Sequence, residues 1–155
     1  MEEIVPPRIR REPPARRDAR IRKHLAQAKD YWLKAPLELA QGDVCQAGEE
    51  GWGTVAQLTK SVATLRSWEH YDHVAIQEAV TALISELPEQ AEAIDQGLSA
   101  AERLHGNFYE VFMTAERAEI AMLQVRPLLE ILWDLLPEEY TGGGSFAEWA
   151  ASDSS

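Results

Sequence analysis

The chain has 155 residues, 45% hydrophobic and 26% charged, a composition typical of a soluble globular protein and not of a disordered or fibrous one. Its length suits a single domain. The net charge of −11 is unevenly spread, because residues 1–23 hold eight basic and four acidic side chains while the remaining residues hold seven basic and 22 acidic ones. This acidic body excludes broad, nonspecific nucleic-acid binding outside the basic end.

The single cysteine, Cys45, excludes an internal disulfide and fits a reducing compartment. No apolar run approaches the roughly 18 residues that cross a bilayer, and the start of the chain lacks the apolar segment of a signal peptide. We therefore expect a cytoplasmic protein that has no contact with membranes.

Residues 1–17 are expected to form a disordered basic arm, since two Pro-Pro pairs stand among arginines. The arm could contact nucleic acid or simply remain solvated. From Asp18 apolar residues recur every three or four positions, which predicts a helix that ends at Gly42. Pro36 lies inside this pattern, and we expect a kink or break there.

A second helix is predicted from Asp43, its cap, to about Leu65. Gly48, Gly51 and Gly53 lie in its first half, and such small residues indicate the close approach of another backbone. The same apolar spacing predicts a third helix up to Pro88.

A fourth helix is predicted over residues 94–108 and a fifth from its cap at Thr114 to Pro137. Short connections and the absence of apolar alternation favour an all-α fold, an antiparallel up-and-down bundle of about five helices over residues 18–137. Residues 138–155, rich in Gly, Ser and acidic residues, are expected to form a flexible tail.

The fifth helix is apolar on more than one face, because Leu129, Trp133 and Leu136 lie off its main stripe. Another surface must cover these side chains. We expect a second copy of the chain to do so in a homodimer, and the alternative is that Phe146 and Trp149 of the tail fold back onto them.

Polar and aromatic residues cluster at the expected end of the bundle, on the second helix, in the loop after it and at the end of the fourth helix. The candidate ligand-binding residues there are Glu49, Trp52, Lys60, His70, His105, Asn107, Tyr109 and Glu110. Glu49 and Lys60 lie at two ends of a stripe with Gly53 and Ala56 as its floor. This stripe could hold a ligand, or its small residues could simply admit the fourth helix. His105 shares a face with apolar residues, so it is either a core histidine or a ligand contact.

These segments resemble the archaeal PaREP family over roughly residues 20–136. The resemblance is carried by Gly42-Asp43, Glu49, Trp52-Gly53, Lys60, Trp68-Glu69-His70 and the run from Ala101 to Glu110. It implies an HEPN-like helical bundle, named for higher eukaryote and prokaryote nucleotide-binding domains. That superfamily includes RNases, toxins paired with nucleotidyltransferase antitoxins, and inactive binding modules, most of them dimeric.

Catalytic HEPN proteins resemble one another in an Arg that is followed after four to six residues by a His, and Arg66 and His73 have this spacing. In such a site His73 would act as general acid or base while Arg66 stabilises phosphate charge. The residue after the Arg is Ser67 here, where the family has a larger polar residue. The other interpretation is that Arg66 is a helix-end cation and His73 caps the third helix.

Two histidines, His70 and His73, without a further fixed pair are a weak metal signal, so we expect neither a metal nor another cofactor. The leading hypothesis is a dimeric, non-catalytic HEPN-like module that binds a nucleotide, RNA or a protein partner at the Glu49, Lys60, His73 and His105 end. The alternative is a metal-independent RNase or toxin that uses Arg66 and His73. A nucleotidyltransferase-type protein is one candidate partner.

Overall fold

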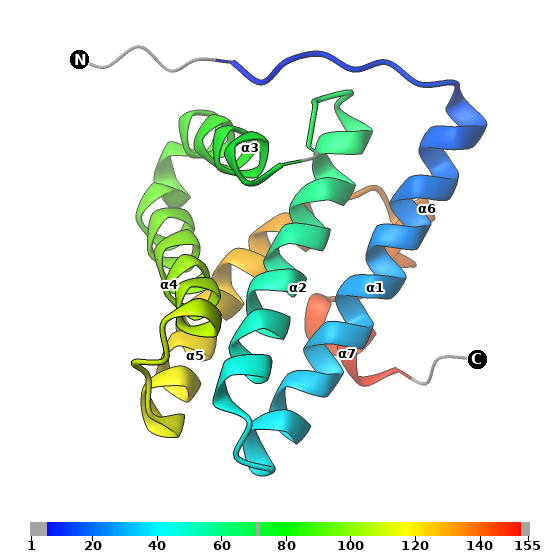
Figure 1. Cartoon of the computed structure of the whole chain (residues 1–155). Helices are drawn as coiled ribbons and strands as arrows, with labels where there is room; N and C mark the ends of the chain where they lie inside the picture. The colour runs from blue at the N-terminus through cyan, green and yellow to red at the C-terminus, as the bar shows by residue number, and fades with distance from the viewer. Residues whose placement is uncertain (1–5, 71, 153–155) are drawn as a thin grey trace.

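The computed structural model describes residues 6–70 and 72–152. Within these ranges the chain forms seven α-helices and one 3-10 turn, with one isolated bridge and no β-strand (Figure 1). The elements are α1 (Pro14–Ala40), α2 (Val44–Leu65), α3 (His73–Glu86), the 3-10 turn (Pro88–Gln90), α4 (Ala91–Tyr109), α5 (Ala115–Asp134), α6 (Glu138–Thr141) and α7 (Phe146–Ala151). The predicted all-α fold is confirmed.

The four long helices α1, α2, α4 and α5 alternate in direction and form the body of the bundle (Figure 1). α1 packs along α2, and α4 and α5 pack against other sides of α2 and against each other. α3 is seen almost end-on in Figure 1, so its axis crosses those of α1 and α2. α3 contacts α2 and α4 and thereby brings its first residues close to both.

Small residues let the other helices approach α2 closely, as its sequence predicted. A Cβ added at Gly48 would lie 3.1 Å from the backbone oxygen of Leu104 in α4, and one at Gly51 would lie 3.2 Å from the Leu104 side chain. A Cβ at Gly53 would lie only 2.8 Å from the ring of Tyr31 in α1. Three glycines therefore set how near α1 and α4 come to the central helix.

The predicted caps at Asp43 and Thr114 are present, with side chains that accept hydrogen bonds from the backbone N–H groups of Gln46 and Arg117. Asp72, not His73, caps α3, because its carboxylate is the short acceptor that the free N–H of Ala75 requires.

α1 continues through Pro36, so the expected break at this residue does not occur. Proline removes the hydrogen bond to the carbonyl of Trp32 and its ring crowds that carbonyl, but its fixed φ is itself helical. Pro36 is exposed, so water can satisfy that carbonyl without a break in the helix.

The described part of the N-terminal arm, residues 6–17, is ordered, contrary to the expectation of a disordered arm. Arg10 N–H donates to the carbonyl of Ser67 at 2.6 Å, and Glu69 N–H donates to the carbonyl of Arg8 at 2.7 Å. α1 then begins at Pro14, four residues before Asp18, because proline at the first turn loses no hydrogen bond. The arm is thus pinned to the loop between α2 and α3. Residues 1–5 lie outside the described residues.

The described part of the tail also packs on the bundle, contrary to the expectation of a flexible tail. Phe146 of α7 is 2% exposed and lies edge-on to Trp133, while Trp149 stacks on Trp133 at 4.6 Å. The indole N–H of Trp133 donates to the carbonyl of Gly144 at 2.8 Å. Large aromatic surfaces and a satisfied indole stabilise this docking. Residues 153–155 lie outside the described residues.

The surface expected to form the homodimer is therefore already covered. Leu129, Trp133 and Leu136 are each 7% exposed or less within one chain, so they cannot be its dimer interface. The folded-back tail, the alternative interpretation of this helix, covers Trp133, and Leu129 and Leu136 lie in the core of the single chain. Dimerisation itself stays a prediction.

Two glycines of α4 offer a matched test of the packing. A Cβ at Gly97 would lie 2.5 Å from the Cβ of Leu128, which cannot rotate away, so we expect Gly97→Ala to lower the free energy of unfolding by about 1–3 kcal/mol. Gly106 has no such neighbour within 4 Å, so Gly106→Ala should raise it by up to about 1 kcal/mol. Urea unfolding followed by circular dichroism measures both, and equal effects would contradict the close contact of α4 with α5.

Candidate functional site

A polar pocket of about 370 Å³ runs along α2, between α1, α3 and α4. We call it the α2 pocket. It is lined by Tyr31, Gln46, Glu49, Glu50, Trp52, Gly53, Ala56, Gln57, Lys60, Asp72, His73, Ile76 and His105. Five residues predicted to lie at one site, Glu49, Trp52, Lys60, His73 and His105, thus line one pocket. Its volume falls in the range of small-molecule sites.

Two imidazole rings lie over the indole of Trp52. The His73 ring is 4.7 Å from the Trp52 ring and inclined by 28°, and the His105 ring is 4.9 Å from it and inclined by 29°. The two imidazoles are 5.3 Å apart, too close for them to lie on opposite faces of the indole. His73 of α3 and His105 of α4 are therefore neighbours on one face of Trp52.

Each of these imidazoles contacts a carboxylate. His105 Nδ1 lies 2.9 Å from Glu49 Oε2, and His73 Nε2 lies 3.4 Å from Glu102 Oε1. The amide of Gln77 also donates to Glu102, at 2.5 Å. A carboxylate fixes which ring nitrogen carries the proton and how the ring is oriented, so the two histidines are held in place and are not free rotors.

Two oppositely charged residues of α2 face the pocket without an ionic partner. Burial lowers the pKa of Lys60, and no carboxylate of the described residues forms an ion pair with it. Burial raises the pKa of Glu50, which is 5% exposed; its Oε1 accepts from the Gln46 amide at 3.4 Å, and its Oε2 has no hydrogen-bond partner among the described residues. Desolvation destabilises both ionised forms, so a ligand that supplied partners to Lys60 and to Glu50 Oε2 would be stabilised here.

His70, predicted as a ligand residue, does not line the α2 pocket. It is 2% exposed, with Nδ1 at 2.9 Å from the carbonyl of Trp68 and Nε2 at 3.3 Å from the hydroxyl of Thr64. These contacts tie the loop after α2 to the helix. His70 therefore stabilises the loop after α2 and is not a ligand residue of the α2 pocket.

Arg66 is not brought together with His73 in the α2 pocket. Its guanidinium makes two hydrogen bonds to the carboxylate of Glu86, at 2.5 and 2.6 Å, and lies over the ring of Trp68. The pair joins the end of α2 to the end of α3. The guanidinium is therefore already neutralised, as the interpretation of Arg66 as a helix-end cation requires.

The three predicted residues at the end of α4 differ in role. Asn107 is fully buried, and its side-chain oxygen accepts from the backbone N–H groups of Phe112 and Met113, so it shapes the turn into α5. Tyr109 is exposed but lies edge-on to His105 at 5.3 Å, beside the pocket. Glu110 is an exposed residue just after α4 and does not line the pocket.

Sequence reasoning missed Glu50 and Glu102 of the site, and His24 behind it. His24 Nδ1 lies 2.7 Å from Gln57 Oε1, and its ring lies edge-on to His70 at 5.7 Å. Burial, with smaller contributions from nearby cations, lowers the pKa of His24 from 6.5 to about 4. Glu50 shares its face of the helix with Gln46, Thr54 and Gln57, so a helix-period count gave no signal that it would be buried.

The fold and the pocket define a helical-bundle protein with a polar, ligand-sized pocket along its central helix. The chain belongs to the archaeal PaREP1/PaREP8 family, whose model matches residues 23–129. No curated protein and no solved structure matches the chain. Among the described residues, no helix has the length and apolar character needed to cross a membrane.

His24 predicts a pH dependence of stability. The unfolded chain takes up this proton near pH 6.5 and the folded chain near pH 4, so the unfolded state binds more protons between these values. This contribution is fully present above pH 6.5 and is lost as the pH falls toward 4. We expect His24→Gln to flatten the fall in the free energy of unfolding between pH 6.5 and 4, measured by urea titrations. An unchanged slope would contradict the burial of a neutral His24.

Proposed function

We propose that the chain is a non-catalytic, HEPN-like module that binds an anionic, nucleotide-like ligand in the α2 pocket. The observation that carries this proposal is a pair of opposite charges on the pocket wall: Lys60, which has no ion pair among the described residues, and Glu50, whose Oε2 has no hydrogen-bond partner among them. The ligand then needs an anionic group for the ammonium and hydrogen-bond donors for the carboxyl group.

The distance between these groups fits an extended ligand. Ten residues of helix separate Glu50 from Lys60, about 15 Å along the axis of α2. A phosphate at Lys60 would leave the remainder of the ligand along Gly53 and Ala56, where small side chains keep the floor low. The hydroxyl or N–H groups of a nucleoside are donors of the kind that Glu50 lacks.

The aromatic wall supports a planar component in the ligand. Trp52, His73 and His105 present ring surfaces in one pocket, and aromatic rings stack on nucleobases whatever the base sequence. Both imidazoles can also donate hydrogen bonds to phosphate oxygens when protonated. A free nucleotide or a single-stranded RNA end has both features.

The position of Arg66 favours binding over catalysis. An RNase that used Arg66 and His73 would need the guanidinium at the phosphate, whereas Arg66 is bound to both oxygens of Glu86. Both contacts come from one guanidinium nitrogen, and they hold Arg66 at Glu86, outside the α2 pocket. Within the HEPN-like interpretation, the chain therefore resembles the inactive binding modules. We propose that it acts as a homodimer or with a nucleotidyltransferase-type partner.

The binding proposal predicts saturable heat changes when AMP or ATP is titrated into the protein in a calorimeter. We expect Lys60→Gln to weaken the affinity at least about tenfold, because it removes a charge-assisted hydrogen bond. Lys23→Gln is the matched control, since it removes the same charge from an exposed site on α1 and should leave the affinity unchanged. Adenosine and inorganic phosphate, titrated separately, identify which part of the nucleotide binds.

Absence of binding by the wild-type protein to AMP, ATP and a short single-stranded oligoribonucleotide would refute the proposal. Equal losses of nucleotide affinity in Lys60→Gln and Lys23→Gln would refute the role of the α2 pocket, because the change in net charge alone would then explain both losses.

The non-catalytic assignment predicts that single-stranded RNA stays intact when incubated with the purified protein. The readout is denaturing gel electrophoresis, with His73→Ala and Arg66→Ala beside the wild type. Cleavage by the wild type that disappears in both variants would establish the RNase that the Arg66 and His73 spacing suggested.

A further inference from the structure

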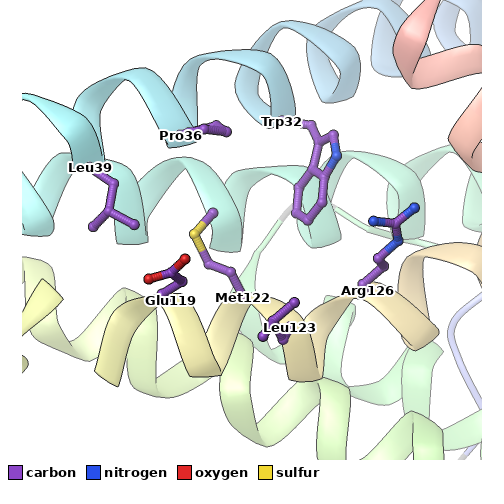
Figure 2. Close-up of a pocket in the computed structure, with 7 residues that line it drawn as sticks. All are labelled: Trp32, Pro36, Leu39, Glu119, Met122, Leu123 and Arg126. Carbon is purple, nitrogen blue, oxygen red and sulfur yellow. The ribbon is translucent and has the colours of Figure 1, made fainter. Parts of the chain in front are cut away.

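A second hollow, of about 190 Å³, lies between α1 and α5, and we call it the α1–α5 groove. Figure 2 shows its lining: Trp32, Pro36, Leu39, Glu119, Met122, Leu123 and Arg126. The apolar side chains of Met122 and Leu123 occupy the middle of the α5 wall, with Glu119 toward one end and Arg126 toward the other (Figure 2).

Exposed apolar side chains extend the groove into a wider surface. Leu123 of α5 is 67% exposed, and Ile120 of the same helix is 56% exposed. Ile120 lies one helical turn before Leu123, so it adjoins the groove. A hydrophobic surface that spans two helices is typical of an interaction site.

The charges on α5 make this surface complementary to itself. Glu119 and Arg126 are seven residues apart, about two helical turns, and so lie on the same side of α5. When two α5 helices pack antiparallel about a two-fold axis between residues 122 and 123, Glu119 of each copy faces the partner's Arg126. One symmetry axis thus forms two ion pairs around a centre of Met122 and Leu123.

We propose that a second copy of this chain covers the α1–α5 groove and forms a two-fold homodimer through α1 and α5. The proposal specifies the surface of the homodimer named above and does not depend on the ligand of the α2 pocket. Arg126 pairs with Glu130 of its own helix at 3.2 Å, and both side chains are about half exposed. Such an exposed pair is weak, so Arg126 can turn to the partner at little cost.

The oligomeric state tests the proposal directly. Sedimentation velocity of the full chain should give twice the monomer mass of 17.4 kDa at micromolar concentration. Leu123→Glu should convert the protein to a monomer, because it places a charge at the centre of the interface. Val74→Glu is the matched control, since Val74 is 59% exposed on α3, away from the groove, and this variant should stay dimeric.

Charge reversal tests the two-fold arrangement. Glu119→Arg alone, and Arg126→Glu alone, should each raise the dimer dissociation constant at least about tenfold, because like charges then meet across the axis. The double variant E119R/R126E restores opposite charges and should return the constant to near the wild-type value. Circular dichroism spectra confirm that each variant is folded.

Three results would overturn the proposal. They are a wild-type protein that stays monomeric at several hundred micromolar, a Leu123→Glu variant that stays dimeric, and a double charge reversal that does not recover the dimer lost in the single variants. Calorimetry with AMP on the Leu123→Glu variant tests the two proposals separately. The α2 pocket lies within one chain, so a monomer that still binds AMP leaves the pocket proposal intact whatever the oligomeric state.

Discussion

The close packing of α2 against α1, α3, α4 and α5 is the constraint on which the rest of the molecule depends. Fifteen of its 22 residues are buried, and its glycines bring Leu104 of α4 and Tyr31 of α1 almost to its backbone. Thr54 and Ser61, buried polar residues, satisfy their hydroxyls on carbonyls one turn back in the same helix. Glu50 Oε1 accepts from Gln46 one turn back, but Glu50 Oε2 has no hydrogen-bond partner and Lys60 no ion pair among the described residues, so the tight packing concentrates their desolvation at the α2 pocket.

The features that sequence could predict are those that depend on local spacing. Apolar residues every three or four positions give the helices, and Asp43 and Thr114 give two caps, because these signals act within one turn of backbone. The glycines of α2 predicted a close approach, but the partner expected for Gly53 was wrong: this glycine faces Tyr31 of α1 and not the fourth helix. The grouping of Glu49, Lys60 and His105 followed from the expected order of antiparallel helices and from a family resemblance, and these side chains do line one pocket.

The features that sequence could not predict depend on contacts between distant segments. Arg66 and His73 are close in sequence, but Arg66 is drawn to Glu86 at the far end of α3. The tail is polar in composition, yet Phe146 and Trp149 cover Trp133. The burial of these two large aromatic side chains stabilises the docked tail more than the ordering of its Gly and Ser residues destabilises it. The arm contains prolines, yet two backbone hydrogen bonds to the loop after α2 suffice to fix it.

The two surfaces of the molecule can operate together because α1 separates them. Tyr31 lines the α2 pocket and Trp32 lines the α1–α5 groove, and consecutive residues of a helix point about 100° apart. A second copy in the groove therefore leaves each pocket open to solvent. Both surfaces share the rigid α1, whose register is held by Tyr31 against Gly53. Because the Tyr31 ring packs directly on Gly53, a ligand that displaced this ring would remove one contact that holds α1 against α2. This ring therefore links the wall of the pocket to the helix that forms one wall of the groove.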